Sequence, residues 1–454
     1  MSDSRNWWKE DLLEKEKILF ALYDKTKAME SKNQTGLAEY IASCSDGKIL
    51  PYEVNNLFSE AAKGVIKKSE FITFFNWLSP LDAKMLDLNL ELGIKQWQES
   101  GVSATHFTEQ QKIQLEQYLK DSQASVTVAL GNAAISEKPL TFGSKDPYAI
   151  HSINKIFTGV LVLRLIEEKP DGKTSILPKD MLNSKVEFDP GVLEKLPSAL
   201  RSHLEANNVT LFQFMTHMGG TGDYGLDRGT GSYRDTIESG KNPEIQNISD
   251  FLPFGEDKIY DVSKGSHYSN LGFILVGLAL EHAYNVYREN HPSLKLPELD
   301  FNGLMNRYLK QEAGMQCFTP KCPENGKFNP TDKAAQHMLG SPAGGYWTAA
   351  DDLAKFAKWL YLHSSEKGFK SLMIQYGKEF YDSSKDVIHH PGSSVSASSL
   401  FALSLKTGNY SIALSDQQGV AHSVGLEFLL GDRIFKRDQV IGNKKNSTFN
   451  PTPS

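Results

Sequence analysis

Cysteine, long apolar runs and excess positive charge are all scarce in this chain. Only 3 of its 454 residues are Cys, too few for the disulfide framework of a small secreted domain. Cys317 and Cys322 lie close in sequence, but no second Cys or His pair lies near them, so we expect ordinary thiols rather than a metal site. The 49 basic and 55 acidic residues give a net charge of −6. That balance argues against nucleic acid as the main ligand, because phosphate binding needs clustered Lys and Arg.

Membrane and export signals are also lacking. The longest apolar stretches, such as 156–163 and 271–280, are about 10 residues or fewer, well short of the roughly 20 that a spanning helix needs. Residues 1–24 have neither the uncharged apolar core nor the small-residue cleavage site of a signal peptide. We therefore expect a cytoplasmic protein by default, without a membrane span. Signal-independent export is the alternative hypothesis.

Composition divides the chain into three parts. Residues 1–118 are charged and carry Leu and Met at helical spacing, most regularly over 81–92, which predicts a helical N-terminal domain of unknown role. Residues 119–440 mix β-branched and apolar helical segments, which predicts an α/β domain. The polar residues 441–454 predict a disordered tail.

Strands are expected at both ends of the central domain, with helices between them. The predicted strands are 125–130, 399–405 and 409–414, and the predicted apolar helices are 152–168, 268–283 and 351–362. The last two strands flank a tight turn and predict a hairpin. This order favours one sheet that joins early and late parts of the chain.

Ser152 and Lys155 are the first candidate catalytic pair. They form Ser-x-x-Lys at the start of a predicted helix, where residues three apart face the same side and the amine can reach the hydroxyl. The free N–H groups of a helix N-terminus can stabilise an oxyanion, and a buried Lys can act as a general base. Alone, the pattern favours a capping Ser and a solvated Lys, and the same spacing recurs at Ser45 and Ser364.

Two later segments supply further candidate groups. Tyr268-Ser269-Asn270 offers a phenol that can take or relay a proton and an amide that can bind the Lys or a substrate. His390-Pro391-Gly392 offers a glycine, which lets an edge strand approach a substrate, and a His facing the same pocket. By itself, the first segment is also explained by a strand-end Tyr and a capping Asn, which are common. For the second segment alone, an ordinary turn is favoured. A literal Lys406-Thr407-Gly408 lies between two apolar runs, so we predict a hairpin turn there rather than a catalytic element.

Six segments, taken in order, resemble the serine β-lactamase-like superfamily of class C β-lactamases, DD-peptidases and related esterases. They are 150–158 (IHSINKIFT), 211–224 (LFQFMTHMGGTGDY), 267–273 (HYSNLGF), 301–315 (FNGLMNRYLKQEAGM), 342–353 (PAGGYWTAADDL) and His390-Pro391-Gly392, which fits the His-x-Gly variant. The resemblance implies an α/β fold of the β-lactamase/transpeptidase type. In that fold, an antiparallel sheet is flanked by helices and joined to an all-helical domain. Here a helical extension precedes it.

The resemblance also implies a covalent acyl-enzyme mechanism that uses no metal or cofactor. Ser152 would be the nucleophile, and Lys155 and Tyr268 would share its activation as base and relay. Asn270 would position Lys155 and the substrate. The implied substrate is a small molecule or peptide that carries an ester or amide.

The resemblance also implies roles for His390-Pro391-Gly392 and the following Ser393, on the opposite side of the implied site from Lys155. The backbone N–H of Ser393, together with that of the nucleophile, would form the oxyanion hole beside Gly392. His390 takes the position of a Lys in the Lys-Thr-Gly enzymes. Because an unperturbed His is mostly neutral near pH 7, it should hold a substrate carboxylate more weakly. This favours an esterase or peptidase-like hydrolase over a dedicated β-lactamase.

Some residues depart from the family pattern or are expected to be structural. His151 stands where the family usually has a small residue, and His217 is interpreted as structural. Thr348 with Asp351 predicts a helix-capping box. The long polar segment 227–256 either borders the pocket or forms a surface loop.

Three functions remain open from the sequence. The first is a serine hydrolase, and the second is a true DD-peptidase or β-lactamase. The third is a catalytically silent scaffold on the same fold, in which residues 1–118 form the active surface. In any of them, residues 1–118 are a candidate surface for a protein partner.

Overall fold

A computed structural model describes most of the central domain and part of the N-terminal region. The described residues are 19, 22–24, 51–63, 65–75, 124–134, 138–225, 232–241, 243–332, 334–384 and 386–421. The helical pattern over 81–92 and the tail 441–454 therefore lie outside the described residues. Within the described part, no helix is both long enough and apolar enough to cross a bilayer.

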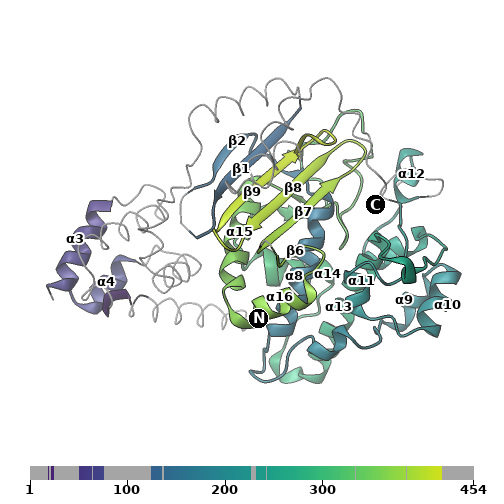
Figure 1. Ribbon diagram of the computed structural model, residues 1–454, viewed down its shortest axis with the longest axis horizontal. Helices are drawn as coiled ribbons and strands as arrows, with labels where there is room; N and C mark the ends of the chain where they lie inside the picture. Colours follow the sequence, from purple (N-terminus) through teal and green to yellow (C-terminus); the bar gives the residue numbers. More distant parts are fainter. Residues whose placement is uncertain are drawn as a thin grey trace.

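The described N-terminal residues are mainly helical, as the sequence predicts for this region. They include α3 (Pro51–Ala62) and α4 (Lys68–Phe74), drawn in purple in Figure 1. Aromatic rings hold these helices together, since Phe71 stacks on Phe58 at a centroid distance of 6.1 Å and meets Tyr23 edge-on at 5.2 Å.

A six-stranded antiparallel sheet forms the centre of the molecule, in the order β2-β1-β9-β8-β7-β6 (Figure 1). Its strands are β1 (Val126–Asn132), β2 (Leu140–Gly143), β6 (Tyr381–Asp382), β7 (Val387–Ser393), β8 (Ser398–Ser404) and β9 (Asn409–Ser415). β1 pairs with β9, so early and late segments share one sheet, as predicted. Lys406-Thr407-Gly408 lies in the β8–β9 turn with Gly408 at φ +78°, which confirms the predicted hairpin.

Helices and a small second sheet surround the main sheet. The second sheet is β3 (Tyr148–Ala149), β5 (Trp347–Thr348) and β4 (Phe318–Thr319), in that order. The longer helices are α8 (Asn154–Glu167), α13 (Asn270–Asn290), α15 (Ala350–Ser364) and α16 (Lys367–Tyr376). The shorter ones are η1 (His151–Ile153), η2 (Lys179–Leu182), α9 (Pro190–Glu194), α10 (Ser198–Ala206), α11 (Leu211–Met215), α12 (Tyr233–Glu238), η3 (Ile248–Phe254), η4 (Val262–Lys264), η5 (Pro292–Leu294), α14 (Phe301–Met305) and η6 (Asn306–Lys310). The three apolar helices predicted from the sequence correspond to η1 with α8, α13 and α15.

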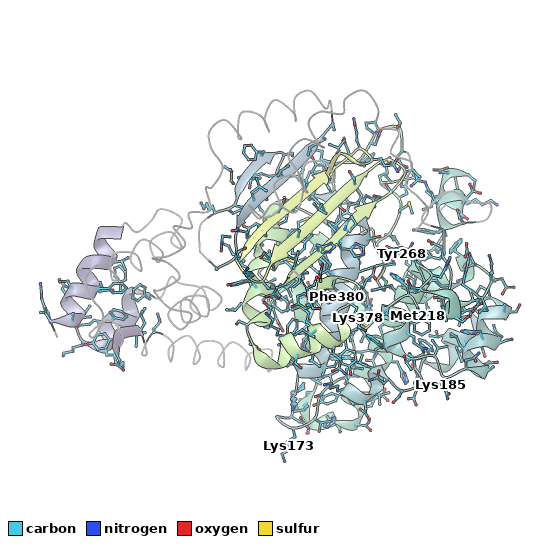
Figure 2. All side chains as sticks on the ribbon, in the orientation of Figure 1. Lys173, Lys185, Met218, Tyr268, Lys378 and Phe380 are labelled. Carbon is cyan, nitrogen blue, oxygen red and sulfur yellow. The ribbon has the colours of Figure 1, made fainter. Side chains whose placement is uncertain are left out.

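The helices α9 to α13 gather on one side of the sheet and form the helical part of the fold (Figure 1). Tyr268 lies where this helical part meets the sheet (Figure 2). The expected architecture of an antiparallel sheet flanked by helices, with a further helical part, is therefore present. The candidate site residues lie at the junction.

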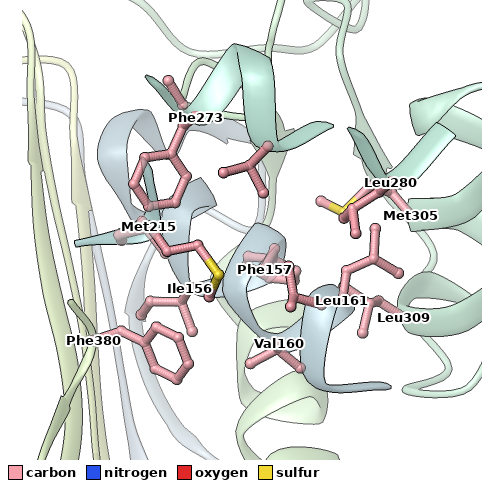
Figure 3. Close-up of a cluster of buried hydrophobic side chains, with 14 of the residues drawn as sticks. Ile156, Phe157, Val160, Leu161, Met215, Phe273, Leu280, Met305, Leu309 and Phe380 are labelled. Atoms are coloured by element: carbon pink, nitrogen blue, oxygen red, sulfur yellow. The ribbon is translucent and has the colours of Figure 1, made fainter. Parts of the chain in front are cut away.

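Helix α8 forms the centre of the main core. Its residues from Ile156 to Leu163 carry no charge, and a helix that is apolar all round is stable only when it is buried. Phe157 stacks on Phe356 of α15 at 4.0 Å and on Phe318 of β4 at 4.7 Å. Figure 3 shows Leu161 of α8 beside side chains of α13, α14 and η6. This packing makes α8 a rigid support for the Lys155 side chain in its first turn.

The predicted capping box at Thr348 and Asp351 is wrong. Thr348 belongs to β5 and is fully buried, and the N-cap residue of α15 is Ala349, which makes no side-chain capping bond. Asp351 instead accepts a hydrogen bond from Thr141 Oγ1 at 3.1 Å, which joins α15 to β2. Pairing of β5 with β3 and β4 therefore takes Thr348 away from the helix end.

The described part of segment 227–256 is more than a surface loop. It contains α12 and η3, and it places Tyr233 and Phe251 in the main core, 5.1 Å apart and edge to face. The Tyr233 hydroxyl accepts a hydrogen bond from the Leu339 N–H at 3.0 Å. The segment is thus tied to the loop that leads to residues 341–343, which contact the site described next.

Candidate active site

Ser152, Lys155 and Tyr268 meet at one point, as the sequence predicts. Lys155 Nζ donates a hydrogen bond to Ser152 Oγ at 3.2 Å, and the Tyr268 hydroxyl donates to the same oxygen at 2.9 Å. One hydroxyl is therefore in contact with two groups that can exchange protons with it, although the three residues come from η1, α8 and the segment before α13. Contacts of this kind can activate a hydroxyl as a nucleophile.

The Lys155 ammonium is fully buried and has a complete set of hydrogen-bond acceptors. Besides Ser152 Oγ, it donates to Asn270 Oδ1 at 2.7 Å and to the Ala343 carbonyl oxygen at 2.9 Å. Its nitrogen also lies 4.6 Å from the ring centre of Tyr268 and 5.4 Å from that of Phe273. Such cation–π contacts and hydrogen bonds offset the cost of burying a charged amine.

The start of α8 is attached to the loop 341–343 by consecutive polar contacts. Asn154 Nδ2 donates to the Ser341 carbonyl at 2.7 Å, and Thr158 Oγ1 donates to the Pro342 carbonyl at 2.7 Å. The residue before the nucleophile, His151, has φ +46°, a left-handed conformation uncommon for residues other than glycine. A glycine would adopt this conformation without the steric cost that a Cβ atom brings.

Asn270 links Lys155 to a carboxylate. Its Oδ1 accepts from Lys155, while its Nδ2 donates to Asp223 Oδ2 at 2.7 Å. The N-cap Ser269 accepts from the Gly272 N–H at 2.8 Å and so fixes the first turn of α13. The amide is therefore held in one orientation, with its oxygen toward the ammonium. Asp223 lies in the segment GTGDY, where no pattern of its own predicts a role for it.

Gly392 lets strand β7 approach the nucleophile segment closely. A Cβ atom built on Gly392 would lie 2.6 Å from the Ile150 carbonyl oxygen and 2.3 Å from Ser399 Oγ. Ser399 Oγ donates to that same Ile150 oxygen at 2.7 Å, which fastens β8 to the residues before the nucleophile. Ser393 follows as the last residue of β7. The geometry thus explains the glycine of the third segment by close backbone approach.

Glu379 is a site residue that the sequence did not reveal. Its Oε1 lies 3.2 Å from His390 Nε2 and 3.0 Å from His217 Nε2. Burial alone would raise the pKa of Glu379, but its hydrogen bonds and charge interactions with His217 and His390 outweigh burial and lower the pKa to about 2. The local sequence GKEFYD carries no motif, so only the fold brings this carboxylate to the site.

His217 connects the same carboxylate to Tyr268. Its Nδ1 accepts a hydrogen bond from the Ser269 N–H at 3.0 Å, and its ring lies 4.4 Å from the Tyr268 ring. Its backbone φ of +58° turns the chain so that the ring points inward. The structural role expected for His217 is therefore consistent with its contacts, which position the phenol.

Comparisons with known proteins give a family for the central domain. A family model described as Beta-lactamase matches residues 123–374. A search of curated proteins found no match. Among solved structures, the chain is similar to a penicillin-binding protein from Bacillus halodurans, at 18% identity over 70% of this chain and 100% of that chain, with a TM-score of 0.49. It is also similar to a penicillin-binding protein homologue from Pyrococcus abyssi (13%, 70% and 76%, TM-score 0.45) and to a class C β-lactamase (13%, 72% and 99%, TM-score 0.45).

Proposed function

Because this chain belongs to the β-lactamase family, we propose that it is a serine hydrolase that cleaves an ester or amide through an acyl-enzyme on Ser152. The observation that carries the proposal is the double contact of Ser152 Oγ with Lys155 Nζ and the Tyr268 hydroxyl. The proposed catalytic domain is residues 119–440, which includes every residue of the site.

In the proposed acylation step, Lys155 begins as the free amine. Ser152 Oγ attacks the substrate carbonyl, and its proton passes to Lys155 directly or through the Tyr268 hydroxyl, so that Lys155 becomes the ammonium. The buried Lys155 ammonium favours negative charge that develops on either neighbouring oxygen, since charges interact strongly where water is excluded. The tetrahedral intermediate then collapses, the bond to the leaving group breaks, and the leaving group departs with the proton that Ser152 gave up.

The remaining parts of the proposed mechanism are the oxyanion hole and deacylation. The backbone N–H groups of Ser152 and Ser393 would bind the carbonyl oxygen as it becomes negative. The approach of β7 to the nucleophile segment at Gly392 supports this pairing. A water molecule then attacks the acyl group, gives its proton to the same Tyr268–Lys155 pair, and the acid leaves as Ser152 is protonated again.

The proposal is tested by covalent labelling. The protein is incubated with a fluorophosphonate and, separately, with a labelled penicillin, and adducts are mapped by mass spectrometry. We expect a fluorophosphonate adduct on Ser152 and none on a Ser152→Ala variant. No adduct with either probe, under conditions that label a control hydrolase, would favour a silent scaffold. A penicillin adduct without the fluorophosphonate adduct would favour a DD-peptidase or β-lactamase.

A further inference from the structure

The side of the site formed by β7 has an unusual charge arrangement, which bears on substrate choice. His390, on β7, faces an acceptor at each ring nitrogen, with Nδ1 2.5 Å from the Pro391 carbonyl oxygen and Nε2 3.2 Å from Glu379 Oε1. His390 is itself buried, and Glu379 also contacts His217. The cluster of Glu379, His390 and His217 is called the carboxylate clamp below.

The net charge of the carboxylate clamp follows from its hydrogen bonds. His217 Nδ1 accepts from a backbone N–H, so this ring can carry a proton only on Nε2 and is neutral. Glu379 contributes one negative charge, because Nε2 of each histidine lies within hydrogen-bonding distance of its Oε1 and favours the ionised carboxylate. The clamp therefore carries a net charge of zero when His390 is protonated and of −1 when His390 is neutral. Neither state is positive.

The lysines near this side of the site have other partners. Lys155 is fully buried, and Asn270 and Ala343 accept its hydrogen bonds. Lys378 precedes Glu379 in the chain, but its side chain is exposed and its Nζ lies over the Phe212 ring at 5.6 Å. A substrate carboxylate at β7 thus finds the carboxylate of Glu379 close by, with no compensating cation supplied by these lysines.

We propose that Glu379 makes this a hydrolase for substrates that are uncharged at the end facing β7, and that it selects against substrates with a carboxylate there. The inference rests on the proposed function and adds the chemical class of the substrate. Glu379 acts through His390 and through its own charge, so it is a specificity-determining and positioning residue. Discrimination of this kind works by placing a repulsive group against the wrong ligand.

The test uses two substrates that differ only in this charge. The pair is the benzoylglycyl thioester of mercaptoacetate and that of mercaptoacetamide, and the released thiol is measured by a colour reaction. We expect the wild-type full-length chain to prefer the amide by about tenfold or more in kcat/KM. We expect Glu379→Gln to shift the ratio about tenfold toward the carboxylate, because one nearby negative charge is removed from a low-dielectric site. Glu281→Gln is the matched control, since Glu281 is a half-buried carboxylate that accepts from Phe301 and lies outside the site.

Each outcome decides the inference. A wild-type enzyme that uses the carboxylate thioester as well as the amide contradicts it, whatever the variant does. A ratio unchanged in a folded Glu379→Gln protein, or an equal loss of both rates, also contradicts it and leaves Glu379 a purely structural role. If Glu379→Gln does not fold, the wild-type ratio decides. Fluorophosphonate labelling of Ser152 is measured in parallel, so that failure of the proposed function is distinguished from failure of the selectivity.

Discussion

Substitution of Gly392 by Ala tests the geometry of the site most directly. The added methyl group would lie 2.6 Å from the Ile150 carbonyl oxygen, whereas ordinary van der Waals contact begins at 3.4 Å. Strand β7 must therefore retreat from the nucleophile segment by about 0.8 Å in that direction, the difference of these two distances. The same methyl would lie 2.3 Å from Ser399 Oγ, so the hydrogen bond from Ser399 to Ile150 is disturbed as well.

A displacement of this size is expected to cost about 100-fold in kcat/KM, because misplacing catalytic groups by about 1 Å has effects of that order. Overpacking also destabilises a fold by about 1–3 kcal/mol, so activity is compared with thermal stability in the same preparation. The rate of Ser152 acylation by a fluorophosphonate and the melting temperature by circular dichroism are the two measurements.

The control variant is Gly191→Ala. Nothing lies within 4 Å of the position that a Cβ would take at Gly191, which is part of the short helix α9. This variant should keep full activity and be as stable as wild type or slightly more stable, because Ala is the better helix former. If Gly392→Ala acylates within about threefold of wild type and melts at the same temperature, then close approach of β7 is not what the site requires.

Three further predictions follow from the structure. Lys155→Ala and Tyr268→Phe should each slow acylation of Ser152 by about 10²–10⁴-fold, because each removes a proton-transfer group. Stopped-flow labelling measures this rate, and normal rates in both variants would refute their proposed roles. Burial raises the pKa of Glu281 to about 7, so its stabilising contribution is complete below pH 4.5 and is lost as the pH rises to 7. Wild type should therefore lose up to about 3 kcal/mol of unfolding free energy between these two pH values through Glu281, and Glu281→Gln should remove that loss. Urea titrations at several pH values measure it, and an unchanged pH dependence in the variant would contradict the burial argument. Lys406→Ala should keep kcat/KM within about twofold of wild type. The reason is distance, since the β8–β9 turn that holds Lys406 is about 20 Å from Ser399 along strand β8. Loss of activity in a folded variant would show a catalytic role.

Much of the fold could be predicted because local patterns agree with the tertiary structure. The uncharged run of α8 needed a fully buried position, and the apolar strands around Lys406-Thr407-Gly408 needed a hairpin. Ser152, Lys155, Tyr268 and Asn270 were candidates from local patterns that also fit ordinary capping residues. The six ordered segments that resemble the serine β-lactamase-like superfamily are what singled them out.

Glu379 and Asp223 could not be predicted in the same way. Neither lies in a periodic segment that would assign it a partner. Asp223 is bound by Asn270, 47 positions away in sequence, and Glu379 contacts His390, 11 positions away, and His217 on a different segment. The capping box at Thr348 failed because a strand pairing outside the local sequence competed for the residue and won. Sequence motifs therefore predict the groups proposed to react, whereas the groups that contact and orient them are known only from the completed fold.

The charged groups of the site form two separate clusters, one around Lys155 and one around Glu379. This separation affects how a charged ligand would bind. Lys155 is linked through the Asn270 amide to the half-buried carboxylate of Asp223. Glu379 faces His390 and the neutral His217, so only a protonated His390 can balance its charge. Because each charge already has a partner within the protein, a ligand gains little by adding a charge of its own. Affinity must then come from the shape of the site, between the sheet and the helical part, and from contacts with the reacting carbonyl. Contacts that strengthen as the carbonyl reacts stabilise the transition state more than the bound substrate.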